Sequence, residues 1–143
     1  MDINEIKSKI WDPNYKYFTI QGRIGKQEFI GKYLMPLLAF IVAAIVIGIV
    51  CGILMGVCAA ISDTLASIVG IVCILLYLVL AVAGIFVGVM NLCGQVRRFH
   101  DFGVTGWAVL IAHVFGFGII TLIVGLIMEG HDNANKYGEP NGK

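Results

Sequence analysis

The sequence predicts an all-α, polytopic membrane protein with three transmembrane helices and a short N-terminal amphipathic segment. Hydrophobic residues make up 59% and charged residues 13% of the 143 positions, against about 45–50% and about 25% in soluble domains. The mean hydropathy is +0.91. The charges are also segregated, because between Lys32 and Glu129 only four side chains are charged: Asp63, Arg97, Arg98 and Asp101. A chain this short has too little interior to hide so many apolar residues from water, so we expect a single integral membrane domain over residues 1–143.

The first segment, residues 1–32, is polar and is expected to be cytoplasmic or interfacial. Ile3, Ile6 and Ile10 recur at helical spacing, and Pro13 should end such a helix. The segment can therefore form a short amphipathic helix on the membrane surface, or it can be a frayed terminus.

Two long uncharged runs follow, at residues 34–61 and 65–94. At 1.5 Å per residue the first would reach about 42 Å, more than the roughly 30 Å of a hydrocarbon core. Each run is thus predicted to be a transmembrane helix. The residues between them, Ser62 to Thr64, leave room for only a very short connection.

Small residues recur every four positions within the first span. They are Ala44, Gly48, Gly52, Gly56 and Ala60. Small residues at this spacing let a second helix approach closely in a membrane. Gly48, Gly52 and Gly56 are therefore predicted to form a helix-packing face, within the monomer or between copies. The alternative is that the pattern reflects glycine-rich composition alone.

The third apolar run, residues 107–128, has the length of one straight crossing, followed by a polar tail over residues 129–143. His113 lies inside the run, and Gly116 and Gly118 lie near its middle. We expect one transmembrane helix here. The alternative is that the two glycines break the run into a re-entrant hairpin.

Basic residues predict the orientation, because cytoplasmic segments carry an excess of lysine and arginine. Six lie before the first span, none in the first connection and two after the second span. The N-terminus and the loop from Gln95 to Trp107 are therefore expected to be cytoplasmic. Three spans would put the tail outside the cell, whereas with a re-entrant last segment the sequence does not decide on which side of the membrane the tail lies.

The loop after the second span is the main polar interval of the apolar part of the chain, and it permits three interpretations. The first is structural: Asp101 pairs with an arginine of the loop or with Arg23, or caps the next helix, while Gly103 and Gly106 turn the chain and Trp107 anchors its return. The second is binding: a basic pocket would hold an anionic lipid head or a phosphorylated ligand. Its predicted residues are Arg23, Lys26, Arg97 and Arg98, oriented by Glu28 and Asp101.

The third interpretation is catalysis by the adjacent His100 and Asp101. A metal-dependent phosphohydrolase site would need further histidine and aspartate ligands, and only His113 and His131 remain. The four cysteines lie in apolar runs without ligand spacing. We therefore predict no catalytic residues, no metal and no cofactor, and expect that the protein is not an enzyme.

Three separated motifs resemble the domain of unknown function 805 family, which comprises small bacterial inner-membrane proteins. The first motif consists of Gly22, Arg23, Ile24, Lys26, Glu28 and Phe29. The second consists of Arg97, Arg98, His100, Asp101, Gly103, Thr105, Gly106 and Trp107. The third consists of Asn135, Lys136, Tyr137, Gly138 and Pro140. The resemblance implies a multi-pass location in the bacterial inner membrane and no agreed activity.

The expected function is that of a non-enzymatic membrane component whose basic cytoplasmic loop binds anionic lipid or a partner. Its expected partners are membrane lipids and a second copy or another membrane protein, with no nucleic acid. The alternative is a small oligomeric transporter or pore-forming protein. That alternative is disfavoured because the first two spans offer almost no polar group beyond Ser67, Tyr77 and Asn91.

Overall fold

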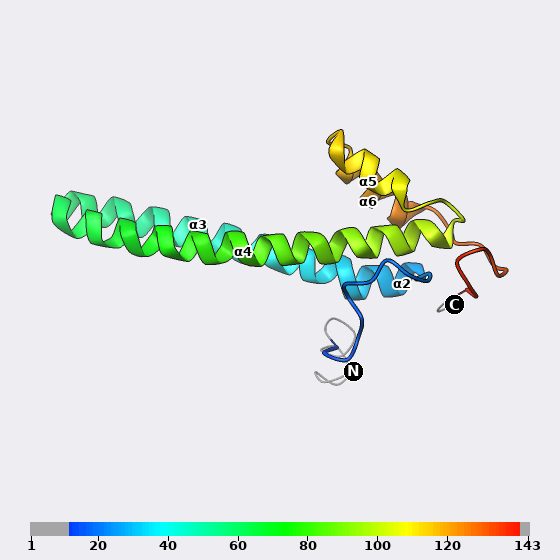
Figure 1. Cartoon of the computed structure of the whole chain (residues 1–143). Helices are drawn as coiled ribbons and strands as arrows, with labels where there is room; N and C mark the ends of the chain where they lie inside the picture. The colour runs from blue at the N-terminus through cyan, green and yellow to red at the C-terminus, as the bar shows by residue number, and fades with distance from the viewer. Residues whose placement is uncertain (1–11, 141–143) are drawn as a thin grey trace. The chain divides into compact units, whose positions relative to one another are not determined.

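The structure is a computed structural model that describes residues 12–140, and it contains no strand in that range. Its elements are α2 (Lys26–Phe29), the π-helix η1 (Ile30–Leu34), α3 (Met35–Ile61), α4 (Asp63–Asp101), α5 (Trp107–Val114) and α6 (Gly118–Ile127) (Figure 1). The predicted surface helix before Pro13 lies outside the described residues. The all-helical class is therefore confirmed for the part of the chain that is described.

Two helices are long and apolar enough to cross a membrane. They run continuously over Lys26–Ile61 and Asp63–Asp101, and their most apolar stretches have mean hydropathies of 3.1 and 3.0. Only 6% of each stretch is buried inside the protein. Apolar side chains that face outward along such a stretch are typical of a membrane protein and not of a soluble core. The first two expected apolar runs thus lie in helices of membrane-spanning length.

The chain divides into two compact units, one of which is the helical hairpin of residues 38–87. Ser62 alone separates α3 from α4, and its backbone N–H still donates to Cys58 O at 2.9 Å. The two helices pack side by side (Figure 1), since the ring of Phe40 lies over Gly84 and the end of Met55 lies near Gly70. Two long apolar helices joined by one residue form an antiparallel pair.

The expected packing face of α3 is mostly open within this hairpin. A Cβ atom built on Gly48 would lie 3.7 Å from the Tyr77 hydroxyl, whereas Gly52 and Gly56 have no such neighbour within 4 Å. The part of this face around Gly52 and Gly56 is therefore not covered by α4.

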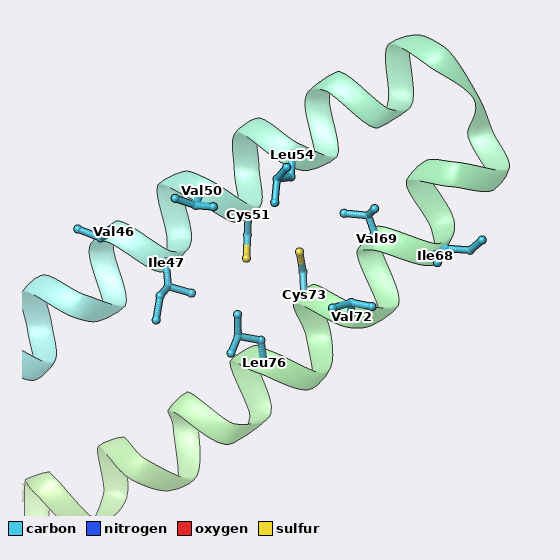
Figure 2. Close-up of a pocket in the computed structure, with 10 residues that line it drawn as sticks. All are labelled: Val46, Ile47, Val50, Cys51, Leu54, Ile68, Val69, Val72, Cys73 and Leu76. Carbon is cyan, nitrogen blue, oxygen red and sulfur yellow. The ribbon is translucent and has the colours of Figure 1, made fainter.

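An apolar cleft of about 370 Å³ lies between α3 and α4 in the same hairpin. Its walls are aliphatic, and Figure 2 shows the thiols of Cys51 and Cys73 pointing toward each other across it. Both cysteines are buried and free. They line the cleft as small apolar residues would.

The second unit is built from residues 12–37 together with residues 88–140. It has two clusters of buried apolar side chains. One contains Tyr17, Ile24, Phe29, Tyr33 and Met90, and the other contains Val96, Phe99, Phe102 and Val109. These clusters join segments distant in sequence, and they support the polar groups described below.

The third apolar run is not the single straight helix that its hydropathy predicts. It forms α5 and α6, which contact each other (Figure 1) and are joined at Gly116 with φ = +80°. The N–H of Phe117 donates to Ala112 O at 2.7 Å and that of Gly116 to His113 O at 3.1 Å. This is the helix-ending arrangement in which a glycine adopts the left-handed conformation. A hydropathy profile does not detect such a turn, because the residues remain apolar. The alternative expectation, in which the glycines break the run, agrees with the structure.

Candidate functional site

Asp101, the last residue of α4, accepts hydrogen bonds from two arginines. Arg23 Nη2 lies 2.8 Å from Asp101 Oδ1, and Arg98 Nη1 contacts the other oxygen, Oδ2. The side chains of Arg23, Arg98 and Asp101 are only 0%, 1% and 6% exposed. We call these three residues the Asp101 cluster. The structural interpretation of the loop expected a pairing of Asp101 with Arg23 or a loop arginine, and the structure contains both.

Arg23 joins the Asp101 cluster to the C-terminal tail. Its Nη1 donates to Asn133 O at 2.9 Å and Gly138 O at 3.1 Å, and its Nη2 donates to His131 O at 2.7 Å. The N–H of His131 in turn donates to Asp101 O at 3.0 Å. Carbonyl oxygens thus complete the coordination of a buried guanidinium, which lowers the cost of taking it out of water.

Arg98 holds the end of α6. Its Nε donates to Gly125 O at 2.9 Å and its Nη2 to Met128 O at 2.6 Å, while its guanidinium lies 4.7 Å from the centre of the Phe102 ring. The last carbonyls of a helix lack partners within it, and a cation there is favoured by the helix dipole. Arg98 therefore supplies the cap that α6 would otherwise lack.

His100 contacts the first and the third motif instead of forming a catalytic pair with Asp101. Its Nδ1 lies 3.2 Å from Gly22 O, and its ring stacks on Tyr137 with centroids 3.8 Å apart. The side-chain amide of Asn135 donates to His100 O at 2.9 Å. His100 and Asp101 thus contact different partners, since both oxygens of Asp101 accept from arginines.

The loop returns to the apolar segment through a turn at Gly103. Gly103 has φ = +73°, and the N–H groups of Gly103 and Val104 donate to His100 O and Phe99 O, both at 3.0 Å. Gly106 precedes α5 without a side-chain cap, so the expected capping by Asp101 does not occur. Trp107 is 69% exposed, which suits a residue at a membrane interface.

Arg97 faces a different group of residues. Its Nη1 donates to the hydroxyls of Tyr15 and Tyr33, each at 2.9 Å. The Tyr15 hydroxyl donates to Glu28 at 2.5 Å. Burial and this hydrogen bond raise the pKa of the Tyr15 phenol above its ordinary value, so the phenol stays protonated. Its hydroxyl donates to Glu28 and accepts from Arg97.

The position of Tyr33 depends on η1 and on two residues of α4. A π-helical turn leaves carbonyl groups out of the regular hydrogen-bond ladder, and the amide of Asn91 donates to Tyr33 O at 3.3 Å. The ring of Tyr33 lies directly on Gly94, where a Cβ atom would be 2.4 Å from it. The amide of Asn91 thus makes a hydrogen bond between α4 and η1. The roles of Tyr15, Tyr33 and Gly94 were not predicted, because nothing in their spacing distinguishes them from interfacial aromatics and packing glycines.

Arg97 lies apart from the other three residues of the predicted basic pocket. Arg23 and Arg98 belong to the Asp101 cluster, and Arg97 lies among the tyrosines. Lys26 is exposed and lines a polar cavity of about 400 Å³ that is also lined by Arg98, Asp101, Glu129 and Asp132. Within residues 12–140 no group of three or more His, Cys, Asp or Glu side chains is arranged to hold a metal ion.

The three motifs that were separate in sequence therefore meet in one unit of the structure. In the comparison with known families, the model described as "Protein of unknown function (DUF805)" matches residues 17–139. Neither the search of curated proteins nor that of solved structures finds a match. The matched range contains all of the residues that build the Asp101 cluster and its contacts with the tail, and the chain belongs to the DUF805 family.

Proposed function

We propose that this protein is a non-enzymatic component of the bacterial inner membrane with two full spans, α3 and α4, and both ends of the chain in the cytoplasm. The observation that carries the proposal is the set of bonds from Arg23 to Asp101 and to three carbonyls of the tail. These bonds bring the N-terminal segment, the loop and the tail together, which supports placing all three on one side of the membrane. The six basic residues before the first span support the cytoplasmic side.

The pair α5–α6 would then enter the membrane from the cytoplasmic side and return to it. Helices of 8 and 10 residues reach only about 12 and 15 Å, half of a hydrocarbon core. Apolar side chains gather around the turn between them, with Val114 83%, Phe115 70% and Ile119 73% exposed. An exposed apolar turn that reaches about halfway into the hydrocarbon core is stable in lipid, whereas the same turn is unfavourable in water.

We propose a non-enzymatic role because the charged side chains form hydrogen bonds within the protein. Arg23, Arg98 and Asp101 bond one another and the backbone, and His100 is stacked on Tyr137. In this arrangement these groups bond one another and the backbone, which supports a role in stabilising the fold. The cytoplasmic unit would serve as a folded surface for lipids or partners.

Reporter fusions test the topology. A cytoplasm-active fluorescent protein fused after Lys143 should fluoresce, and a periplasm-active alkaline phosphatase at Lys143 should be inactive. The same two reporters inserted at Asp63, between α3 and α4, should give the opposite result. An active phosphatase at Lys143 would instead support three spans and refute this arrangement.

The small-residue face of α3 would act between copies of the protein or with another membrane helix. Gly52 and Gly56 are left open by α4, and close approach between helices in lipid requires such residues. This face is a proposal about assembly and is independent of the topology.

A further inference from the structure

Arg97 differs from the other two buried arginines in having no carboxylate partner. Its side chain donates hydrogen bonds to two tyrosine hydroxyls, whereas the side chains of Arg23 and Arg98 each pair with Asp101. Arg97 is only 8% exposed, and its Nε is enclosed without a hydrogen-bond partner. A guanidinium in these surroundings has lost its water and has not gained a counter-charge.

Such a charge is costly unless an anion accompanies it. Glu28 does not serve directly, because the Tyr15 hydroxyl stands between them. The hydroxyls of Tyr15 and Tyr33 turn lone pairs toward Nη1 but carry no charge at neutral pH. The contrast with Arg98, whose guanidinium reaches a carboxylate and three carbonyls, indicates that Arg97 is left for an external anion.

A second cation lies beside the same ring. The guanidinium carbon of Arg97 is 5.5 Å and the Lys32 ammonium 5.8 Å from the centre of the Tyr15 ring. Lys32 precedes the first apolar run and Arg97 follows the second. In the proposed topology both therefore lie at the cytoplasmic boundary of the membrane, where lipid phosphates are found.

We propose that Arg97, assisted by Lys32 and the hydroxyls of Tyr15 and Tyr33, binds a phosphate-bearing anion. The fork of an arginine matches the oxygens of a phosphate, and such charge-assisted bonds are among the strongest in proteins. The phosphate can belong to the head of an anionic lipid or to a soluble compound. The inference rests on the proposed membrane arrangement, and it replaces a pocket of four basic residues by a site in which Arg23 and Arg98 take no part.

The test uses the full-length protein, purified in non-ionic detergent and freed of lipid. The apparent affinity for phosphatidylglycerol is measured by native mass spectrometry, and thermal unfolding is followed with phosphatidylglycerol or with inorganic phosphate. Arg97→Met should weaken binding by on the order of tenfold or more and should remove the ligand-dependent rise in unfolding temperature. Lys26→Met, which removes an exposed cation elsewhere in the same unit, should change neither.

Without ligand, Arg97→Met should unfold at the same or a higher temperature than wild type, because replacing an uncompensated buried charge by an apolar chain relieves its desolvation. If that variant does not fold, Lys32→Met provides the second measurement and should weaken binding severalfold. A rise with phosphatidylglycerol alone assigns the site to a lipid head, and one with inorganic phosphate assigns it to a soluble ligand. Equal binding by wild type, Arg97→Met and Lys32→Met would overturn the proposal, whatever the reporter fusions give.

Discussion

Arg23 Nη2 and Asp101 Oδ1 lie 2.8 Å apart although 78 residues separate them in the chain. Both side chains are almost fully buried, and Asp101 is also the counter-charge of Arg98. One carboxylate therefore balances two guanidinium groups, and the N-terminal segment, the end of α4 and the tail all depend on it.

Replacing this carboxylate should be strongly destabilising. Asp101→Asn removes the carboxylate that Arg23 and Arg98 share, and breaking a buried pair in this way costs about 3–5 kcal/mol. The expected result is a large fall in the unfolding temperature of the detergent-solubilised protein, measured by circular dichroism. Asp63→Asn, at an exposed position beginning α4, is the matched control and should have little effect. A small fall for Asp101→Asn, similar to that of the control, would contradict the role given to the cluster.

Two glycines of α4 should respond in opposite ways to the same substitution. Alanine is favoured over glycine inside a helix by about 1 kcal/mol, and Gly88 has open space where a Cβ atom would lie. At Gly94 the new methyl group would meet the Tyr33 ring at 2.4 Å, and such overpacking typically costs about 1–3 kcal/mol. Gly88→Ala should therefore raise the unfolding temperature and Gly94→Ala should lower it. Equal shifts for the two variants would show that Tyr33 does not rest on α4.

Self-association should depend on the open part of the small-residue face. Gly52→Leu adds a large side chain where α4 makes no contact, so the monomer should keep its unfolding temperature while a second helix can no longer approach. The oligomeric state in detergent, measured by light scattering after gel filtration, should shift toward the monomer. Ile53→Leu, at a neighbouring position that is 61% exposed, should leave it unchanged. Identical masses for wild type and Gly52→Leu would refute packing through this face.

Much of the helical architecture follows from the sequence, because long uncharged runs permit few structures in a membrane. The pairing of Asp101 with arginine was also predictable, since a charge beside apolar runs needs a partner. The separation of Arg97 from Arg98 was not. Adjacent residues on a helix point about 100° apart, so one meets the tyrosines and the other Asp101, and only the packing of the unit determines which.

The break in the third apolar run was equally inaccessible to hydropathy, and it depends on Gly116. At φ = +80° a residue with a Cβ atom is disfavoured by about 1–2 kcal/mol. Gly116→Ala should therefore loosen the turn between α5 and α6 and speed hydrogen–deuterium exchange of the amides in Gly118–Ile127, read by mass spectrometry. Gly56→Ala, at an open helical position, should leave these rates unchanged. If Gly116→Ala instead slows exchange across residues 107–128, the run prefers one continuous helix, and the short re-entrant pair would have to be abandoned together with the cytoplasmic tail.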